Sequence, residues 1–403
     1  MLRHGKYLRG FSERMGSVPR RLRLPRDGEQ AIWVHAVSVG EVLAVTGLVR
    51  ELQRRFPQHK IFVSTTTDTG QALARKTFGA EQVFYFPLDF AFAVGSWMKA
   101  LRPELVVVAE TEFWPNFLRL AHQSGARVAV VNARISDRSW PRYRRFPGLM
   151  RRLLSYVDVF LAQTDLDARR LREIGAAPAS VSVVGNLKFD VQPPKASAIV
   201  ERLRSSFKSA KVGPVLVCGS TVEGEEPLLL KAFENVLAQH PRAAMILAPR
   251  HPERFAAVGA LLDQVGILFF RRSAWNGEPL AGAVLLLDTI GELAALYAIA
   301  DLAFVGGSLV PRGGHNILEP AQYGAAIVVG PHTENFREIV GLFEWQDAVR
   351  VVTPAELPLA LIELLADDAA RQALGKRAAE TLRAHQGATA RTVDAIQKLL
   401  ARP

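Results

Sequence analysis

The chain alternates between short continuous apolar runs and longer segments in which apolar residues recur every three or four positions. The first pattern is typical of strands that are buried on both faces, and the second is typical of amphipathic helices. Seven runs in the N-terminal half predict strands at residues 31–37, 60–67, 82–88, 104–110, 126–133, 159–164 and 180–186. Six runs in the C-terminal half predict strands at 214–220, 243–249, 267–273, 283–288, 301–308 and 325–331. Because helices separate nearly all of these runs, we expect an α/β protein with two parallel sheets, each covered by helices on both faces.

The length of 403 residues exceeds what a single hydrophobic core usually organises, so we expect two domains. The alternating pattern lapses after residue 190 into a stretch with a Pro-Pro pair and a Gly-Pro pair, which favours a linker. Two Rossmann-like, doubly wound domains that face each other across a cleft would bind ligands at the carboxyl ends of their strands. The expected divisions are a basic, membrane-proximal segment at 1–30, a first domain at 31–190, a linker at 191–213, a second domain at 214–385, and a C-terminal helix at 386–403 that packs back on the first domain.

The composition indicates a globular protein, with 49% hydrophobic and 22% charged residues. The single cysteine, Cys218, lies in an apolar run and excludes an intramolecular disulfide. No apolar run reaches the roughly 18 residues that a membrane-spanning helix needs.

The net charge of +11 is concentrated in two segments. Residues 1–26 carry eight Lys or Arg against Glu13, and residues 134–152 carry seven Arg against Asp137. Such a patch attracts phosphates, either on a nucleic acid or on an anionic membrane. The N-terminal part interleaves apolar and basic residues, which fits a short amphipathic helix in a membrane interface or a solvated basic tail. Because we find no nucleic-acid reader motif and no aromatic stacking platform, we do not expect a nucleic-acid partner.

The segment 304–330, FVGGSLVPRGGHNILEPAQYGAAIVVG, is the densest candidate site in the C-terminal half. Paired glycines allow close approach to a ligand, and a helix that starts near His315 would offer free N–H groups to a phosphate. Glu319 could accept hydrogen bonds from ribose hydroxyls. Arg250 follows a strand and offers a fixed fork of donors to an anion. The predicted nucleotide-sugar site comprises Ser220, Arg250, Gly307, Gly314, His315, Asn316 and Glu319.

In the N-terminal half, polar residues again follow predicted strands. Glu41 ends the run IWVHAVSVGE, where an acid in the first helical turn is explained by helix capping or by catalysis. Glu110 and Glu112 follow a later strand, and Asn132 and Arg134 follow the next one. We assign these four residues to the acceptor side of the site.

Few residue patterns in the sequence indicate a metal site or another class of enzyme. The histidines lack the spacing of a zinc site, and Asp165 and Asp167 open a helix, so helix capping explains this pair better than metal binding. We expect no metal and no cofactor. The sequence contains no GxGxxG after its first strand, no P-loop and no GxSxG motif, which argues against a dehydrogenase, an NTPase and an esterase.

Six motifs together resemble a known family. HAVSVGE, ETEFWPN, NAR.S, GNLKFD, APRHPERF and GGSLV..GGHNILEPA occur in this order, over residues 31 to about 385. The set is similar to the bacterial 3-deoxy-D-manno-octulosonic acid (Kdo) transferases of lipopolysaccharide synthesis.

The resemblance implies a GT-B glycosyltransferase that transfers Kdo from CMP-Kdo to the tetraacyl lipid A precursor, a disaccharide bisphosphate. It implies inversion at the anomeric carbon and no metal in the chemical step, at the cytoplasmic face of the bacterial inner membrane. By motif, Glu41 corresponds to the general base, and Arg250, Gly307, Asn316 and Glu319 fall on the CMP-binding side. Family members commonly begin with a hydrophobic N-terminal anchor, and this sequence shows none, so either a peripheral basic segment substitutes for it or this sequence lacks those residues. No obligate protein partner is implied.

Two alternatives remain open from the residues themselves. One is another GT-B-like enzyme that uses a UDP-sugar, such as a glycosyltransferase or an epimerase. The other is a non-enzymatic protein that binds anionic surfaces through its basic patch.

Overall fold

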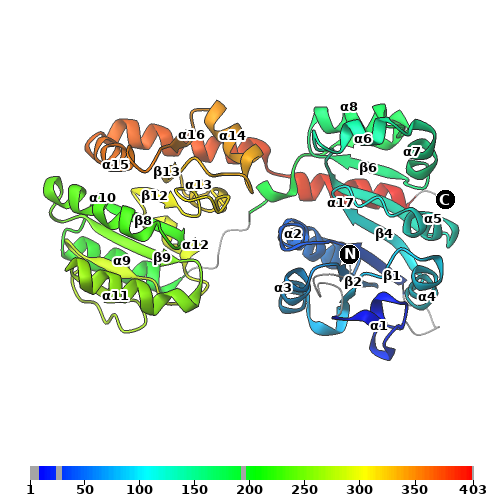
Figure 1. Cartoon of the computed structure of the whole chain (residues 1–403), viewed down its shortest axis with the longest axis horizontal. Helices are drawn as coiled ribbons and strands as arrows, with labels where there is room; N and C mark the ends of the chain where they lie inside the picture. Colours follow the sequence, from blue (N-terminus) through cyan, green and yellow to red (C-terminus); the bar gives the residue numbers. More distant parts are fainter. Residues whose placement is uncertain (1–8, 24–29, 192–196, 402–403) are drawn as a thin grey trace. The chain divides into compact units, whose positions relative to one another are not determined.

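The structure, a computed structural model, describes residues 9–23, 30–191 and 197–401. The chain forms two compact units (Figure 1). Unit 1 comprises Met1–Asp190 and His385–Pro403, and unit 2 comprises Val191–Ala384. Parts of the predicted N-terminal segment and linker, namely residues 1–8, 24–29 and 192–196, lie outside the described residues.

Unit 1 contains a seven-stranded parallel sheet in the order β3-β2-β1-β4-β5-β6-β7. Its strands are β1 (Gln30–His35), β2 (His59–Thr65), β3 (Val83–Tyr85), β4 (Pro103–Ala109), β5 (Arg127–Ala133), β6 (Val159–Ala162) and β7 (Val181–Val183). Its α-helices are α1 (Phe11–Arg14), α2 (Val39–Arg55), α3 (Asp68–Phe78), α4 (Ala91–Leu101), α5 (Pro115–Gln123), α6 (Trp140–Arg144), α7 (Pro147–Leu154), α8 (Asp165–Glu173) and α17 (Ala388–Leu400). Its short 3-10 helices are η2 (Arg20–Leu22), η3 (Ala80–Gln82), η4 (Pro178–Ser180) and η5 (Leu187–Phe189).

The two faces of this sheet bury two separate hydrophobic clusters, as the continuous apolar strands require. Helices α4, α5, α7 and α8 cover one face, and α2, α3 and α17 cover the other. Helix α17 inserts Val393 and Ile396 into the second cluster. Its first turn is held by Asp190, whose carboxylate accepts the N–H groups of Gly387 at 2.6 Å and Thr389 at 2.5 Å. The C-terminal helix is therefore part of unit 1.

Unit 2 contains a second seven-stranded parallel sheet in the order β10-β11-β9-β8-β12-β13-β14. Its strands are β8 (Val215–Thr221), β9 (Ala244–Pro249), β10 (Phe269–Arg271), β11 (Val284–Leu286), β12 (Leu302–Val305), β13 (Ala326–Val329) and β14 (Arg350–Val351). Its helices are α9 (Ala198–Ser209), α10 (Glu226–Gln239), η6 (Pro252–Arg254), α11 (Phe255–Val265), α12 (Leu293–Leu296), η7 (Tyr297–Ile299), α13 (Leu318–Ala321), α14 (Arg337–Trp345), α15 (Leu357–Ala366) and α16 (Asp368–His385), the last of which reaches the boundary with unit 1.

The sheet of unit 2 is also covered on both faces. Helices α10, α11 and α15 pack on one face, and α9 and α12 pack on the other. Cys218 is fully buried in the first of these clusters, as the apolar run around it predicts.

Each sheet changes its winding direction at one point. In unit 1 the chain leaves β1 toward β2 and later resumes at β4 on the other side of β1, and in unit 2 it does the same at β8 and β12. Ligands in open α/β sheets bind beyond the carboxyl ends of the strands at such a switch point. Glu41 and Glu110 follow β1 and β4, and Ser220 and Gly307 lie at the ends of β8 and β12.

The described part of the N-terminal segment packs against unit 1. Helix α1 has only four residues, while Val18 and Leu22 are buried in the same cluster as α4. Arg14 is 1% exposed, donates to the carbonyl oxygen of Thr66 at 2.7 Å and lies over the ring of Tyr85. Between residues 9 and 23, the segment is therefore a folded part of the unit and not one continuous amphipathic helix.

The expected fold class is confirmed, with two corrections of detail. The strand β14 was not predicted, because its two residues are partly exposed and lack a continuous apolar run. The helix expected to start near His315 begins at Leu318 and has a single turn, and residues 313–316 are irregular. The glycine doublet and a proline after Glu319 leave little chain with helical preference at this position.

Candidate active site

Glu41 lies in the first turn of α2 and folds back onto the turn that precedes the helix. The N–H of Val37 donates to Oε2 of Glu41 at 2.8 Å, and Oγ of Ser38 donates to Oε1 at 3.1 Å. The carbonyl oxygen of Val37 is held in turn by the N–H groups of Thr66 and Thr67, each at 3.1 Å. The carboxylate therefore braces the turn before its helix and accepts no N–H group of the helix itself, and the neighbouring β2 loop fixes the same turn.

The environment of Glu41 suits an acid-base role as well. The residue is only 9% exposed, and burial raises the pKa of Glu41 from 4.5 to about 7 against the opposing effect of the Val37 N–H. The negative charges of Glu110 and Glu112 raise this pKa further. A carboxylate has about four lone pairs, and two of those of Glu41 are used by Val37 and Ser38. At neutral pH the group is poised between its two protonation states, as an efficient general base should be.

Glu110 and Glu112 occupy the loop after β4, on the other side of the switch point. Glu110 has a left-handed backbone with φ of 55°, and its carboxylate lies 3.9 Å from Nζ of Lys188. Glu112 accepts a hydrogen bond from the indole N–H of Trp114 at 2.9 Å, and burial raises the pKa of its carboxyl. Because both act on the pKa of Glu41, the structure brings the three acids into one electrostatic cluster.

Asn132 and Arg134 lie at the end of β5, next to the loop of Glu110. Asn132 is 1% exposed and has φ of 51°, and its Oδ1 accepts the N–H of Leu187 at 3.0 Å. This bond fixes the motif that carries Lys188. Arg134 is half-buried at the same edge. The predicted acceptor-side residues thus share one sheet edge with Glu41.

The predicted donor-side residues gather at the carboxyl edge of the unit 2 sheet. Ser220 lies near the end of β8 with φ of 56°, and Arg250 follows β9, the neighbouring strand. The backbone N–H of Arg250 donates to the carbonyl oxygen of Thr221 at 2.9 Å, while its side chain is exposed. The backbone of Arg250 is therefore held at this edge of the sheet, and its guanidinium is accessible to an anion.

Gly307 and Gly314 bring two loops together. The N–H of Gly314 donates to the carbonyl oxygen of Gly307 at 2.7 Å, and both glycines have left-handed backbones. A Cβ on Gly307 would lie 2.9 Å from the ring of His315, so no larger residue fits between the loops. Burial lowers the pKa of His315 from 6.5 to about 4, and the positive charges of Arg250 and His251 lower it further. His315 is therefore neutral at pH 7, and its buried Nε2 has no hydrogen-bond partner among the described residues.

Asn316 and Glu319 complete this set. Oδ1 of Asn316 accepts the N–H of Leu318 at 3.1 Å and so starts the single turn of α13. Burial raises the pKa of Glu319, against a hydrogen bond with Asn316 and the positive charge of Arg250. Arg250, His315 and Glu319 are thus close enough to affect one another's charge.

Three residues that the sequence analysis did not select belong to these sites. Lys188 lies in the motif GNLKFD, where a lysine that follows a glycine-asparagine turn is a readable signal. Ser38 stands three residues before Glu41, the spacing of a capping box, which is a readable signal. Glu225 is fully buried beneath the loop of Gly307, and nothing in the local sequence indicates its partners.

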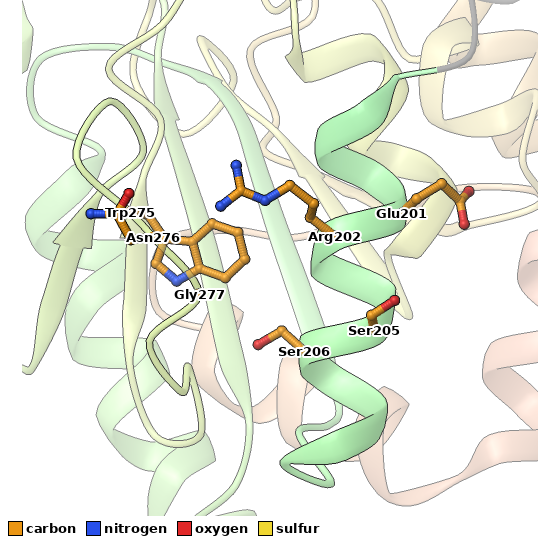
Figure 2. A pocket seen from close by; sticks show the side chains of 7 residues that line it. All are labelled: Glu201, Arg202, Ser205, Ser206, Trp275, Asn276 and Gly277. Atoms are coloured by element: carbon orange, nitrogen blue, oxygen red, sulfur yellow. The ribbon is translucent and has the colours of Figure 1, made fainter.

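A separate shallow pocket of about 340 Å³ lies between α9 and the loop after β10 (Figure 2). It is lined by Glu201, Arg202, Ser205, Ser206, Trp275, Asn276 and Gly277. The guanidinium of Arg202 lies 5.2 Å from the centre of the Trp275 ring. None of the predicted site residues lines this pocket.

Two kinds of feature are absent from the part of the chain that the structure describes. Over 9–23, 30–191 and 197–401, no group of three or more His, Cys, Asp or Glu side chains is arranged to hold a metal ion. In the same ranges, no helix combines the length and apolar character that a membrane crossing needs.

Comparison with known proteins identifies the family. Residues 9–191 match the family described as 3-Deoxy-D-manno-octulosonic-acid transferase (kdotransferase). A 3-deoxy-D-manno-octulosonic acid transferase of Haemophilus influenzae is 36% identical over 93% of this chain and 88% of its own length. The chain belongs to the Kdo transferase family. A Kdo transferase of Bordetella pertussis is 37% identical over 94% of this chain and 89% of its own length.

Solved structures support the same fold. UDP-GlcNAc 2-epimerase from Neisseria meningitidis, bound to UDP-GlcNAc, has a TM-score of 0.56 at 15% identity, over 92% of this chain and all of that one. Anabaena Alr3699/HepE, in complex with UDP and glucose, has a TM-score of 0.53 at 15% identity, over 93% of this chain and all of that one. At such low identity these similarities show the GT-B-like fold alone.

Membership in this family confirms that the protein is a glycosyltransferase of the Kdo transferase type. The alternative of a non-enzymatic protein that binds anionic surfaces was wrong, because the chain belongs to a family of enzymes. Of the two enzyme interpretations, family membership supports the Kdo transferase over the UDP-sugar enzyme.

Proposed function

We propose that this Kdo transferase moves Kdo from CMP-Kdo to the tetraacyl disaccharide bisphosphate precursor of lipid A, with inversion and without a metal in the chemical step. The observation that carries the proposal is Glu41, a nearly buried carboxylate with a pKa of about 7 at the switch point of unit 1. Unit 1 would bind the acceptor and unit 2 the donor, so that each unit supplies one half of the reaction.

The donor half needs a cation for the CMP phosphate. Arg250 is exposed beside β8, and a guanidinium can give two charge-assisted hydrogen bonds to a phosphate. Glu319 lies within its electrostatic reach and could accept a ribose hydroxyl. Gly307 and Gly314 allow the ligand to approach the backbone, and Ser220 and Asn316 add polar contacts at the same edge.

In the chemical step, Glu41 takes the proton of an acceptor hydroxyl as its oxygen attacks the anomeric carbon of Kdo. The bond between this carbon and the phosphate oxygen breaks, and CMP leaves with the electron pair. Attack opposite the leaving group inverts the anomeric centre. General base catalysis contributes about 10²- to 10⁴-fold, and Arg250 stabilises the charge that develops on the phosphate. The protonated Glu41 then returns its proton to water.

The acceptor half carries both signs of charge. Lys188 lies 3.9 Å from Glu110, and Arg134 lies at the end of the adjacent strand β5. These cations suit an acceptor that bears phosphates, while Glu110 and Glu112 can accept hydrogen bonds from sugar hydroxyls. The buried Nδ2 of Asn132 has no partner among the described residues and adds a donor at this edge.

We further propose that a basic and apolar surface on α6 and α7 holds the enzyme at the cytoplasmic face of the inner membrane. Phe146 is 62% exposed and Leu149 is 64% exposed, although Met150 and Leu153 of the same helix are buried. All five arginines of the surface are exposed, namely Arg142, Arg144, Arg145, Arg151 and Arg152. Exposed apolar side chains among arginines are typical of segments that lie in an anionic membrane interface.

This surface adjoins the acceptor side of unit 1. The rings of Phe113 and Tyr143 lie 6.0 Å apart, which joins α6 to the loop of Glu112. An acceptor that remains in the membrane could therefore reach the edge that carries Glu110 and Glu112 without leaving the lipid phase completely.

The test is incubation of the purified protein with CMP-Kdo and the lipid A precursor, followed by mass spectrometry of the lipid. We expect a mass increase of one Kdo residue or more, an inverted anomeric centre by NMR, and unchanged turnover in excess EDTA. Competition should occur with CMP and not with UDP. Transfer that required a UDP-sugar, or that EDTA abolished, would contradict the corresponding part of the proposal.

A further inference from the structure

Glu225, the residue that precedes α10, holds the donor-side loop from beneath. Its side chain is fully buried, and its two carboxylate oxygens accept four backbone hydrogen bonds. Oε2 accepts the N–H of Val222 at 3.0 Å and that of Gly307 at 2.7 Å. Oε1 accepts the N–H groups of Ser308 and Leu309, each at 2.9 Å.

Three successive N–H groups that converge on one point form an anion-binding nest of the kind that often holds phosphate. In this protein a carboxylate from the protein itself fills the nest. A charged group is costly to bury unless it is hydrogen-bonded, and here four donors compensate for the lost hydration. Removing the acceptor would leave buried N–H groups without a partner, which costs more than the bonds contribute.

The bonds of Glu225 join the two loops of the switch point in unit 2. A Cβ on Gly306 would lie 2.8 Å from Oε2 of Glu225 and 2.6 Å from the carbonyl oxygen of Ser220, so the loops after β8 and β12 touch. Gly307 in turn accepts the N–H of Gly314 at 2.7 Å. The position of the residues next to Gly314 therefore depends on the carboxylate of Glu225.

The loop is fixed from its other side too. The N–H of Gly330, after β13, donates to Oγ of Ser308 at 2.8 Å, and this hydroxyl donates to the carbonyl oxygen of Val305 at 2.6 Å. The N–H groups of residues 306–309 and the hydroxyl of Ser308 are thus all hydrogen-bonded before any ligand binds.

We propose that Glu225 is a positioning residue, an internal anion that fills the nest after β12 and presets the donor loop. The CMP phosphate is then bound by Arg250 and the residues around 314–316, and not by the N–H groups of Gly307, Ser308 and Leu309. This inference rests on the proposed donor, and it adds that Glu225 fixes the conformation of the donor-side loop.

Hydrogen exchange on the unmodified enzyme tests the assignment of the nest. The N–H groups of Gly307, Ser308 and Leu309 should be strongly protected without ligand, and saturating CMP should change their exchange less than twofold. A tenfold gain of protection on CMP addition would mean that the nest binds the phosphate, and the inference would be wrong. Because no substitution is involved, this measurement does not depend on a variant that folds.

Glu225→Gln tests the positioning role, with Glu226→Gln as the matched control. Glu226 is the next residue and is equally buried, but it contacts Oγ1 of Thr221 and the guanidinium of Arg254 and not the donor loop. We expect Glu225→Gln to raise the Kd for CMP and the KM for CMP-Kdo at least tenfold with kcat within about threefold, because an amide replaces one acceptor oxygen by a donor. Glu226→Gln should change the Kd for CMP less than threefold.

An equal rise of the Kd for CMP in the two variants would mean that the loss of either buried carboxylate has the same effect. This result would overturn the positioning role of Glu225. An unchanged Kd in a folded Glu225→Gln enzyme would do the same. If the unmodified enzyme itself failed to bind CMP, the proposed donor would be wrong, and the hydrogen exchange of residues 307–309 without ligand would still report on the nest.

Discussion

The backbone N–H of Val37 donates a 2.8 Å hydrogen bond to Oε2 of Glu41. The turn between β1 and α2 therefore holds the carboxylate of Glu41, which lies in the first turn of α2. A glutamate carboxyl that accepts such a hydrogen bond would ordinarily be ionised well below neutral pH. Here burial, together with Glu110 and Glu112, raises the pKa of Glu41 to about 7. The same side chain can therefore stabilise the helix and exchange a proton near neutral pH.

Replacement of Glu41 by Gln should abolish most of the transfer and leave donor binding intact. Gln keeps the size of the side chain but cannot accept the proton, so we expect kcat to fall by about 10²- to 10⁴-fold. The Kd for CMP should stay within about twofold, because the predicted donor residues belong to unit 2. Glu51→Gln, at a partly exposed position of the same helix, is the control and should retain full activity. Substantial turnover by Glu41→Gln would place the base elsewhere.

The pH dependence of kcat/KM should report the pKa of Glu41. Since the base acts in its ionised form, activity should rise with pH around a midpoint near 7. Glu110→Gln removes a negative charge that raises this pKa, so the midpoint should move to lower pH, whatever the effect on the maximal rate. Glu104→Gln, at the opposite end of β4, should leave the midpoint unchanged. An unchanged midpoint in Glu110→Gln would argue against Glu41 as the titrating group.

The raised pKa of Glu41 should also appear in the free energy of unfolding. Glu41 binds its proton more tightly in the folded protein, so its contribution is fully present below pH 4.5 and is lost as the pH rises through about 7. The shift corresponds to a difference on the order of 3 kcal/mol between the two ends of this range. Urea unfolding at several pH values should show Glu41→Gln gaining stability relative to the unmodified protein as the pH rises. A stability difference that was constant with pH would contradict the shift.

Arg250→Ala should weaken CMP binding by about 10- to 100-fold, the loss expected for one charge-assisted hydrogen bond of about 1.5–3 kcal/mol. Arg250→Lys should recover only part of the affinity, because an ammonium lacks the planar fork of a guanidinium. The matched control is Arg242→Ala. Arg242 lies before β9 and Arg250 follows it, so the two arginines are at opposite ends of the same strand. Isothermal titration with CMP measures all three variants. Equal losses for Arg250→Ala and Arg242→Ala would remove Arg250 from the donor site.

Charge reversal on α6 and α7 should weaken membrane binding. Each Lys or Arg near an anionic surface contributes about 1 kcal/mol, so reversing Arg142, Arg145 and Arg152 to Glu should lower binding to anionic vesicles by more than about 100-fold. The control, Lys231→Glu with Arg337→Glu on unit 2, removes two exposed cations and should have a much smaller effect. Sedimentation with vesicles of anionic and of neutral lipid provides the measurement. Unchanged sedimentation of the triple variant would remove the membrane role of this surface.

Phe146→Ser with Leu149→Ser tests the apolar part of the same surface. These exposed side chains should enter the membrane interface, so their loss should weaken vesicle binding. The weakening should be similar at low and at high salt, because salt screens charges and not apolar contacts. Ser substitution at two exposed positions should leave the unfolding transition nearly unchanged. If binding depended on salt alone and not on these two residues, attachment would be purely electrostatic.

The hydrophobic pattern predicted both sheets and nearly every strand, because burial on two faces leaves a continuous apolar run that is visible locally. The strand β14 was missed for the opposite reason, since its two residues are partly exposed. The contact between Ser38 and Glu41 was also readable, because the two residues stand within one turn. The short irregular start of α13 was not, as the paired glycines allow several backbone paths and tertiary contacts select one.

The sequence by itself determined the α/β class, the strand runs and the motifs that identify the family. Only the tertiary structure decided the electrostatics of Glu41, which arise from burial and from acids about seventy positions away along the chain. It also decided that Glu225 fills the nest at Gly307, a contact between residues 82 positions apart. Periodicity and propensity act over a few residues, whereas desolvation and long-range hydrogen bonds exist only after the sheet has brought distant loops to the same edge.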